Sequence, residues 1–231
     1  MLRFLGRGSA FCNDNNCAFF AQNSRLVLLD CPMSAFHKLK TIGADALTGC
    51  KTEKITVLVT HSHSDHTGGI GMLVHFCYYV MHIPVEIIAP SSAVKDKLRF
   101  LLKELDGCRE EGYTLISADE MQTGFTPVPT IHSPELAGQC FGWCFEIDGT
   151  RVVYTGDTAT LDTFKDVLTD GAYLYTETAS FDSAVHLRLN VLKEMLPELE
   201  KRGIKVYLMH LDDEDKIAKA LPDVKFAPLY E

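Results

Sequence analysis

The stretch Thr60-His61-Ser62-His63-Ser64-Asp65-His66 places three imidazoles and one carboxylate within seven residues. The β-branched run Ile55-Thr56-Val57-Leu58-Val59 stands directly before it and predicts a buried strand, so the histidines occupy the loop at the end of that strand. Imidazole and carboxylate groups are ligands that suit zinc, iron or manganese. Alternate residues of His-x-His can point the same way, and the Asp-His pair then turns back. One loop can therefore supply ligands to two adjacent metals.

Size and composition predict an ordinary globular protein. The 231 residues fit one large domain or two fused halves, and 46% of them are hydrophobic and 23% charged. The eight cysteines show no disulfide-like spacing, and the first residues lack the apolar core of a signal peptide. We therefore expect reduced, mostly buried thiols in a cytoplasmic protein. The apolar stretches are too short to span a bilayer, so we expect no membrane association.

The charge balance narrows the class of partner. The formal net charge is −9, from 22 basic and 31 acidic residues. Tight binding of a long nucleic acid needs many phosphate neutralisations, which this balance disfavours. A small anionic substrate remains compatible, because two bound divalent metals reverse the local field.

Strand and helix patterns divide the chain into two halves, about 1–112 and 113–231, with no linker between them. In the first half we expect strands at 3–6, 18–21, 25–30, 55–60 and 85–89, and helices at 34–44 (capped by Ser34), 69–82 and 91–105. In the second half we expect strands near 115–116 and at 124–131, 140–147, 151–155, 172–176, 205–210 and 224–227, and helices at 161–168, 189–201 and 213–221. This pattern predicts an α/β fold of two sheets packed face to face with helices outside.

The His-x-His-x-Asp-His loop after a strand resembles the signature of the metallo-β-lactamase-like hydrolases. Four further elements of their pattern follow in the right order and cover nearly the whole chain: Asp30 closing the strand 25–30, His132 after Ile131, Asp157 after Gly156, and His210 after Met209. The resemblance implies a single domain over residues 1–231, folded as a four-layer αβ/βα sandwich of the metallo-β-lactamase type.

The resemblance also implies two divalent metal ions, with zinc expected first and manganese or iron as alternatives. By the family's pattern, His61, His63 and His132 hold one metal, while Asp65, His66 and His210 hold the second and Asp157 bridges the pair. Asp30 is expected to orient a ligand or the histidine loop, and Thr60 is a further candidate for such a contact. Asp157 also has a simpler interpretation, in which its side chain caps the predicted helix that begins at Leu161.

Two features favour a phosphodiesterase within that family. The best-known dizinc β-lactamases place a cysteine where this chain has Asp157, which argues against antibiotic hydrolysis. Glu177 and His186 resemble the pair of the ribonuclease Z branch, in which a glutamate supports a histidine acting as general acid, and the segment 4–11 resembles that branch's first strand and glycine loop. His186 departs from the pattern because Leu187 and Arg188 follow it in place of small hydroxyl residues. The plain alternative is a histidine at a helix start beside a surface carboxylate.

The leading hypothesis is a dinuclear metal hydrolase in which water activated between the metals attacks a small phosphodiester. Asp65 accepts or orients the proton of the nucleophile, and His186, supported by Glu177, protonates the departing oxygen. The region 68–120 lacks the basic, glycine-rich arm that grips tRNA in ribonuclease Z, so a cyclic nucleotide is the better expectation. A thioester or lactone hydrolase of the glyoxalase II type, a flavodiiron-like redox protein and a non-catalytic metal-binding protein stay open. Homodimers are common among such enzymes, so a homodimer stays open too.

Overall fold

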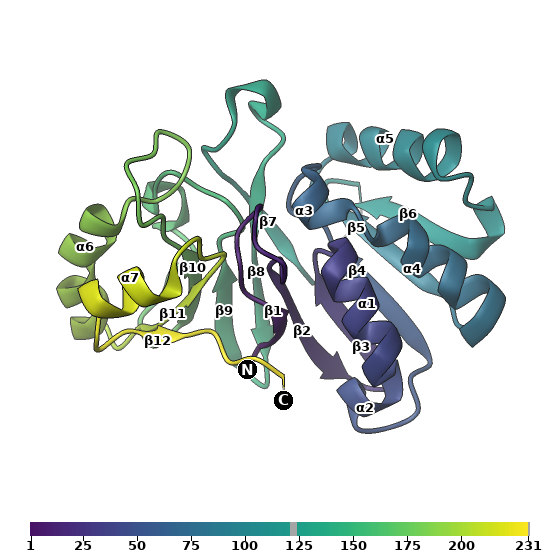
Figure 1. The fold of residues 1–231 in the computed structure, drawn as a ribbon, viewed down its shortest axis with the longest axis horizontal. Coiled ribbons are helices and arrows are strands. Elements are labelled where there is room, and N and C mark those ends of the chain that lie inside the picture. The colour runs from purple at the N-terminus through teal and green to yellow at the C-terminus, as the bar shows by residue number, and fades with distance from the viewer. Residues whose placement is uncertain (121–123, 231) are drawn as a thin grey trace. The chain divides into compact units, whose positions relative to one another are not determined.

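The computed structural model describes residues 1–120 and 124–230, and the chain divides into two compact units (Figure 1). The first unit comprises Met1–Arg7, Asn13–Gln122 and Pro228–Glu231. The second comprises Gly8–Cys12 and Thr123–Ala227. The expectation that residues 1–231 form one domain of two equivalent halves stays a prediction, and its residues 121–123 and 231 lie outside the described part of the chain.

The first unit is built on a six-stranded sheet whose spatial order follows the sequence. Its first three strands are antiparallel neighbours, and each later pair is parallel. The strands are β1 (Arg3–Gly6), β2 (Cys17–Gln22), β3 (Arg25–Leu29), β4 (Lys54–Leu58), β5 (Val85–Ala89) and β6 (Tyr113–Ser117). Nearly every residue of β3 and β4 is buried, as expected for parallel strands covered on both faces.

The second unit repeats this plan with its own six-stranded sheet. Two antiparallel pairs again lead into three parallel pairs. The strands are β7 (Thr126–Pro129), β8 (Phe141–Ile147), β9 (Thr150–Tyr154), β10 (Tyr173–Glu177), β11 (Lys205–Met209) and β12 (Lys225–Phe226). Because β7, β9, β10 and β11 all run the same way, their carboxyl ends meet at one edge of the sheet, which is where open α/β sheets hold their sites.

Helices pack on the strands of both sheets. In the first unit α1 packs on β1, α2 on β2 and β3, and α5 on β5 and β6, while α4 packs on α1. In the second unit α6 packs on β11, burying Leu192 and Leu199 in a core with Leu174 and Leu208. The helices are α1 (Met33–Ile42), α2 (Ala44–Thr48), α3 (Ser64–Thr67), α4 (Ile70–Phe76), α5 (Ser92–Phe100), α6 (Leu189–Lys201) and α7 (Glu214–Ala220). The expected α/β class is confirmed.

Two predicted helix details are wrong. The helix expected at 161–168 is only a 3₁₀ turn over Asp162–Phe164, because its amides close on carbonyls three residues earlier, as in Phe164 N–H to Leu161 O at 3.0 Å. Ser34 does not cap α1, which begins at Met33 after Pro32. The Ser34 hydroxyl instead accepts a hydrogen bond from the Asn15 amide at 3.0 Å.

Three other elements differ in extent or in position. The helices expected at 69–82 and 91–105 each begin as an α-helix and finish as a π-helical turn, over Cys77–Met81 and Leu101–Leu105. The strand near 115–116, expected to open the second half, is β6. It lies at the edge of the first sheet because the β5–α5–β6 crossover returns it alongside β5 as a parallel neighbour.

The cysteines agree with the expectation of reduced thiols. All eight are free, and six are buried; Cys12 is half-buried and Cys50 exposed. Burial raises the pKa of the Cys77 thiol to about 12 and that of Cys108 to about 11, so both stay protonated at neutral pH. No helix within residues 1–120 and 124–230 has the length and apolar character needed to cross a membrane.

We expect Gly69→Ala to destabilise the first unit, because a Cβ at Gly69 would lie 2.6 Å from the Pro32 carbonyl oxygen. That backbone cannot yield easily, since the Gly69 amide donates to Cys31 O at 2.9 Å and the Cys31 amide to His66 O at 2.8 Å. A loss of about 1–3 kcal/mol in unfolding free energy is expected from urea titration. Gly112→Ala is the matched control, because its Cβ would meet Tyr78 at an ordinary 3.5 Å. Equal stability of the two variants would contradict the assigned contact.

Candidate metal centre

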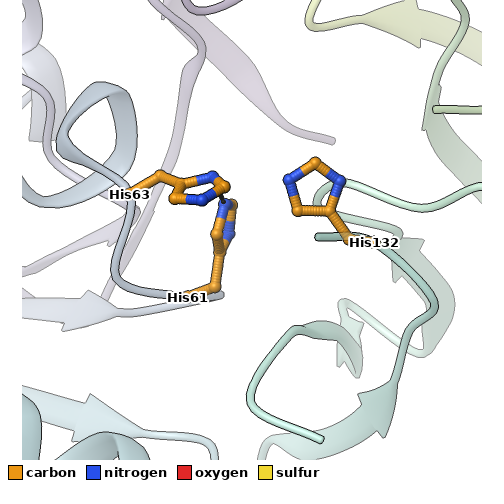
Figure 2. Close-up of side chains that lie close together, drawn as sticks. All are labelled: His61, His63 and His132. Carbon is orange, nitrogen blue, oxygen red and sulfur yellow. Dashed lines mark hydrogen bonds between the residues drawn. The ribbon is translucent and has the colours of Figure 1, made fainter. Parts of the chain in front are cut away.

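In the first unit, the histidine loop leaves β4 and turns at once into the short helix α3. His61 is fully buried, and its Nε2 lies 3.0 Å from His63 Nδ1, so the two ring nitrogens converge (Figure 2). The ring centroids of His61 and His66 are 4.2 Å apart, and His66 Nε2 lies 3.3 Å from Asp65 Oδ2. Within this unit the structure therefore brings together all four candidate ligands of the loop.

Asp30 holds this loop from the neighbouring strand. It follows β3, the parallel neighbour of β4, and its fully buried carboxylate accepts from the Thr60 amide at 2.7 Å and the Thr60 hydroxyl at 2.8 Å. His66 Nδ1 lies 2.8 Å from Asp30 Oδ2, and a carboxylate accepts, so Nδ1 donates and Nε2 carries the lone pair. The arrangement orients His66 as carboxylates orient metal-bound histidines.

The backbone conformation and the pKa of Asp30 both reflect its buried position beside the histidine loop. Its φ is 61°, in the left-handed region that non-glycine residues rarely occupy, and His210 after β11 has a φ of 52°. Such strain persists where the surroundings fix it and is frequent at functional sites. Burial raises the pKa of the Asp30 carboxyl above its usual value, against the lowering effect of His66 and of the two Thr60 donors.

In the second unit, three candidate ligands stand at the carboxyl ends of strands that run in one direction. His132 follows β7, Asp157 follows β9 and His210 follows β11. His132, the third imidazole drawn in Figure 2, has Nδ1 2.9 Å from the Val185 carbonyl oxygen, which can only accept. The Nδ1 therefore donates, and the lone pair of His132 lies on Nε2.

The Asp157 carboxylate faces a different histidine with each oxygen. Its Oδ2 lies 3.6 Å from His132 Nε2, and its Oδ1 lies 3.5 Å from His210 Nε2. All three side chains are almost fully buried. The alternative role of Asp157 as a helix cap is wrong, because the helix expected from Leu161 is only the 3₁₀ turn Asp162–Phe164.

A second carboxylate–histidine pair lies beside these ligands. Glu177 ends β10 and is buried, and its Oε2 accepts from His186 Nδ1 at 2.7 Å, while Oε1 accepts from the Thr158 amide. The ring of His186 has its centroid 4.9 Å from that of His132 and 5.6 Å from that of His210. One buried carboxylate thus fixes His186 next to the candidate ligands of this unit, which excludes the plain surface-carboxylate interpretation of Glu177.

The donor set fits a divalent metal. Two nitrogens bound to one zinc at about 2.0–2.1 Å lie about 3.3 Å apart in tetrahedral geometry. The four ligand-atom separations given above for pairs within a unit run from 3.0 to 3.6 Å. Borderline nitrogen and hard oxygen donors, buried and with orienting bonds on their far side, suit zinc, manganese or iron. The two faces of Asp157 suit a carboxylate shared between two ions.

The sequence patterns assigned no role to the residues around His186. Asp212 accepts from the Ser180 amide at 2.8 Å and from the Ser180 hydroxyl, and Val185 supplies the carbonyl that orients His132. Backbone carbonyls carry no residue-type signal, so Val185 could not have been found. Asp212, two residues after His210, offered only its position.

Comparison with known proteins agrees with this geometry. A family model described as Anti-Pycsar protein Apyc1 matches residues 1–227. The chain belongs to the Apyc1 family. A relative named Anti-Pycsar protein Apyc1 from Bacillus phage 010DV004 is 25% identical over 95% of this chain and 92% of its own length. Another relative of the same name, from Bacillus phage vB_BveM-Goe7, is 26% identical over 92% of this chain and 89% of its own length.

Solved structures identify the fold. The metallo-β-lactamase fold protein YhfI from Bacillus subtilis superposes with a TM-score of 0.73 at 18% identity, over 96% of this chain and 92% of its own. A diphosphatase from the PhnP family superposes with a TM-score of 0.71 at 18% identity, over 99% of this chain and 93% of its own. Human tRNase Z, short form, superposes with a TM-score of 0.63 at 17% identity, over 100% of this chain and 97% of its own. The predicted metallo-β-lactamase type of fold is confirmed, and with the family it makes the chain a metal-dependent hydrolase.

We expect Asp30→Asn to weaken metal binding about 10–100-fold, because the amide cannot hold His66 Nδ1–H as a carboxylate does. Competition with a chromogenic chelator measures the affinity, after circular dichroism has shown that the variant is folded. Asp119→Asn is the control, since this exposed carboxylate also accepts a backbone amide, from Ser92 at 3.0 Å, but in a different loop. Unchanged affinity in folded Asp30→Asn would contradict the orienting role.

Proposed function

We propose that this hydrolase is a phosphodiesterase acting on a small anionic diester, with a cyclic nucleotide as the best candidate. In this proposal seven residues would hold two divalent cations, zinc first: His61, His63 and His132 would hold one, Asp65, His66 and His210 the other, and Asp157 would serve both. The observation that carries the proposal is the 2.7 Å hydrogen bond between His186 Nδ1 and the buried carboxylate of Glu177, beside His132 and His210.

The pair distinguishes among hydrolase classes because leaving groups differ in their need for a proton. An alkoxide leaving a phosphodiester departs poorly unless an acid protonates it, whereas a thiolate leaving a thioester needs little help. The His186 side chain is 21% exposed while Glu177 is 1% exposed, so the ring can reach a substrate and its partner cannot. A buried carboxylate maintained behind a partly exposed imidazole is the arrangement that general-acid chemistry requires.

Each residue then has a defined task. When bound, the two cations supply a water of lowered pKa and offset charge on the phosphoryl oxygens. Asp65 accepts the proton of the attacking water as the new P–O bond forms. His186 donates its Nε2 proton to the departing oxygen as the old P–O bond breaks, and Glu177 offsets the charge of the protonated ring and fixes its direction. Glu177 is a positioning residue, since it acts through His186.

The comparisons support the same substrate class. Two structural relatives carry names for cleaving phosphate linkages, a diphosphatase and a tRNase. The net charge of −9 disfavours folded tRNA as the substrate and leaves small diesters. The absence of a basic, glycine-rich insertion over 68–120 points the same way.

We expect His186→Ala to lose about 10²–10⁴-fold in kcat on a diester with an alkoxide leaving group, and far less on bis(p-nitrophenyl) phosphate, whose leaving group needs no acid. Both rates are measured on protein whose metal content equals that of the wild type. His75→Ala is the control, because His75 lies on α4 in the first unit and contacts the Asp106 carbonyl, Cys108 and Tyr79 there.

Three outcomes would contradict the proposal. Equal losses on both diesters would remove the general-acid assignment. Wild-type cleavage of thioesters or lactones, with diesters untouched, would favour the glyoxalase II type of reaction. A metal-loaded protein that hydrolyses none of these substrates would favour a non-catalytic role.

A further inference from the structure

A cavity of about 210 Å³ opens beside the Glu177–His186 pair, and it lies wholly within the second unit. His186 and His210 line its inner end. The segment Gly8–Cys12 and Phe181 line the rest, and the lining is largely apolar. Sites that hold a whole drug-sized ligand measure roughly 300–1,000 Å³, so this cavity suits a single ring system.

Two phenylalanines at this cavity are exposed to water. Phe11 is fully exposed, and Phe181 is 52% exposed. Single apolar side chains on a surface need no explanation, but two aromatic rings lining one cavity next to a general acid form a local apolar site. Neither ring contributes to the core of its unit, so neither is explained by folding.

Both segments that carry the rings are anchored at their bases. Gly8 and Leu211 form a parallel bridge, the Ser9 amide donates to Leu211 O at 2.9 Å, and the Cys12 amide closes a turn on Ser9 O at 3.0 Å. That turn carries Phe11 at its tip.

The second segment is fixed just before Phe181. Asp212 accepts from both the amide and the hydroxyl of Ser180, and the Ala179 amide donates to Leu187 O at 2.8 Å. Rings presented from anchored loops lose little entropy when a ligand binds.

We propose that the nucleobase of the substrate stacks on Phe11 and Phe181 while the phosphate lies toward His186. The inference rests on the proposed phosphodiesterase function and deepens it by assigning Phe11 and Phe181, which line the cavity beside His186, to the base of the substrate. Stacking on an aromatic ring is available to every base, since each has a π-face. Broad tolerance among bases is therefore expected, in place of selection for one.

The test compares substrates with and without a base. For the wild type, Phe11→Ala, Phe181→Ala and the double variant, kcat/KM is measured on the 3′,5′-cyclic monophosphates of adenosine, guanosine, cytidine and uridine, and on ribose 3′,5′-cyclic phosphate. We expect each alanine variant to lower the ratio of base-containing to base-free kcat/KM about tenfold, chiefly through KM. Tyrosine at either position is expected to restore the ratio.

Phe100→Ala is the matched control, because Phe100 is 58% exposed and lies on α5 in the first unit. The wild-type ratio is expected there. A ratio that stays at the wild-type value in the double variant overturns the base-binding site and leaves the phosphodiesterase standing. Equal losses on all five substrates also overturn it, since the rings would then act on the catalytic groups. A wild type that cleaves none of the five but does cleave bis(p-nitrophenyl) phosphate overturns the base-binding site alone, and one that cleaves neither overturns both proposals.

Discussion

The buried carboxylate of Asp30 is the constraint on which the histidine loop depends. It accepts from the amide and hydroxyl of Thr60 and holds His66 through Nδ1, all within 2.8 Å. The sheet makes this possible, because β3 and β4 are parallel neighbours and Asp30 and Thr60 leave the same edge. The left-handed backbone of Asp30 stores the strain that the contact requires. Without this carboxylate, His66 would lose the bond that fixes its ring and the Thr60 amide would lose its acceptor.

Much of the fold and of the histidine loop could be predicted from the sequence, because the residue patterns that indicate them are local. The β-branched run before Thr60 predicted β4, and the helix over Leu189–Lys201 was predicted with the bounds it has. The Asp148-Gly149 turn joins β8 to β9 as its sequence indicates, with positive φ at both residues. The metallo-β-lactamase type of fold followed from ligand motifs that recur in a fixed order at strand ends.

The rest depended on contacts between residues far apart in the chain. Periodicity cannot tell whether the segment after Asp157 forms an α-helix, since burial of Phe164 and Leu168 is compatible with a 3₁₀ turn as well. The same limit applies to the bond from the Thr158 amide to Glu177, which exists only once β9 and β10 are paired, whereas the link of Glu177 to His186 was expected from the resemblance. Phe11 and Phe181 gave no sequence signal, because an exposed aromatic ring is indistinguishable from a core residue until burial is known.

The central proposal is that seven residues, from the histidine loop and α3 and from the ends of β7, β9 and β11, hold two metals. The most direct measurement is anomalous X-ray diffraction from zinc-loaded crystals, recorded on both sides of the zinc absorption edge. The account predicts two anomalous peaks per chain. One lies about 2.0–2.2 Å from His61, His63 and His132 and the other at that distance from Asp65, His66 and His210, with Asp157 bound to both. A single peak, or zinc bound without Asp157, would contradict it.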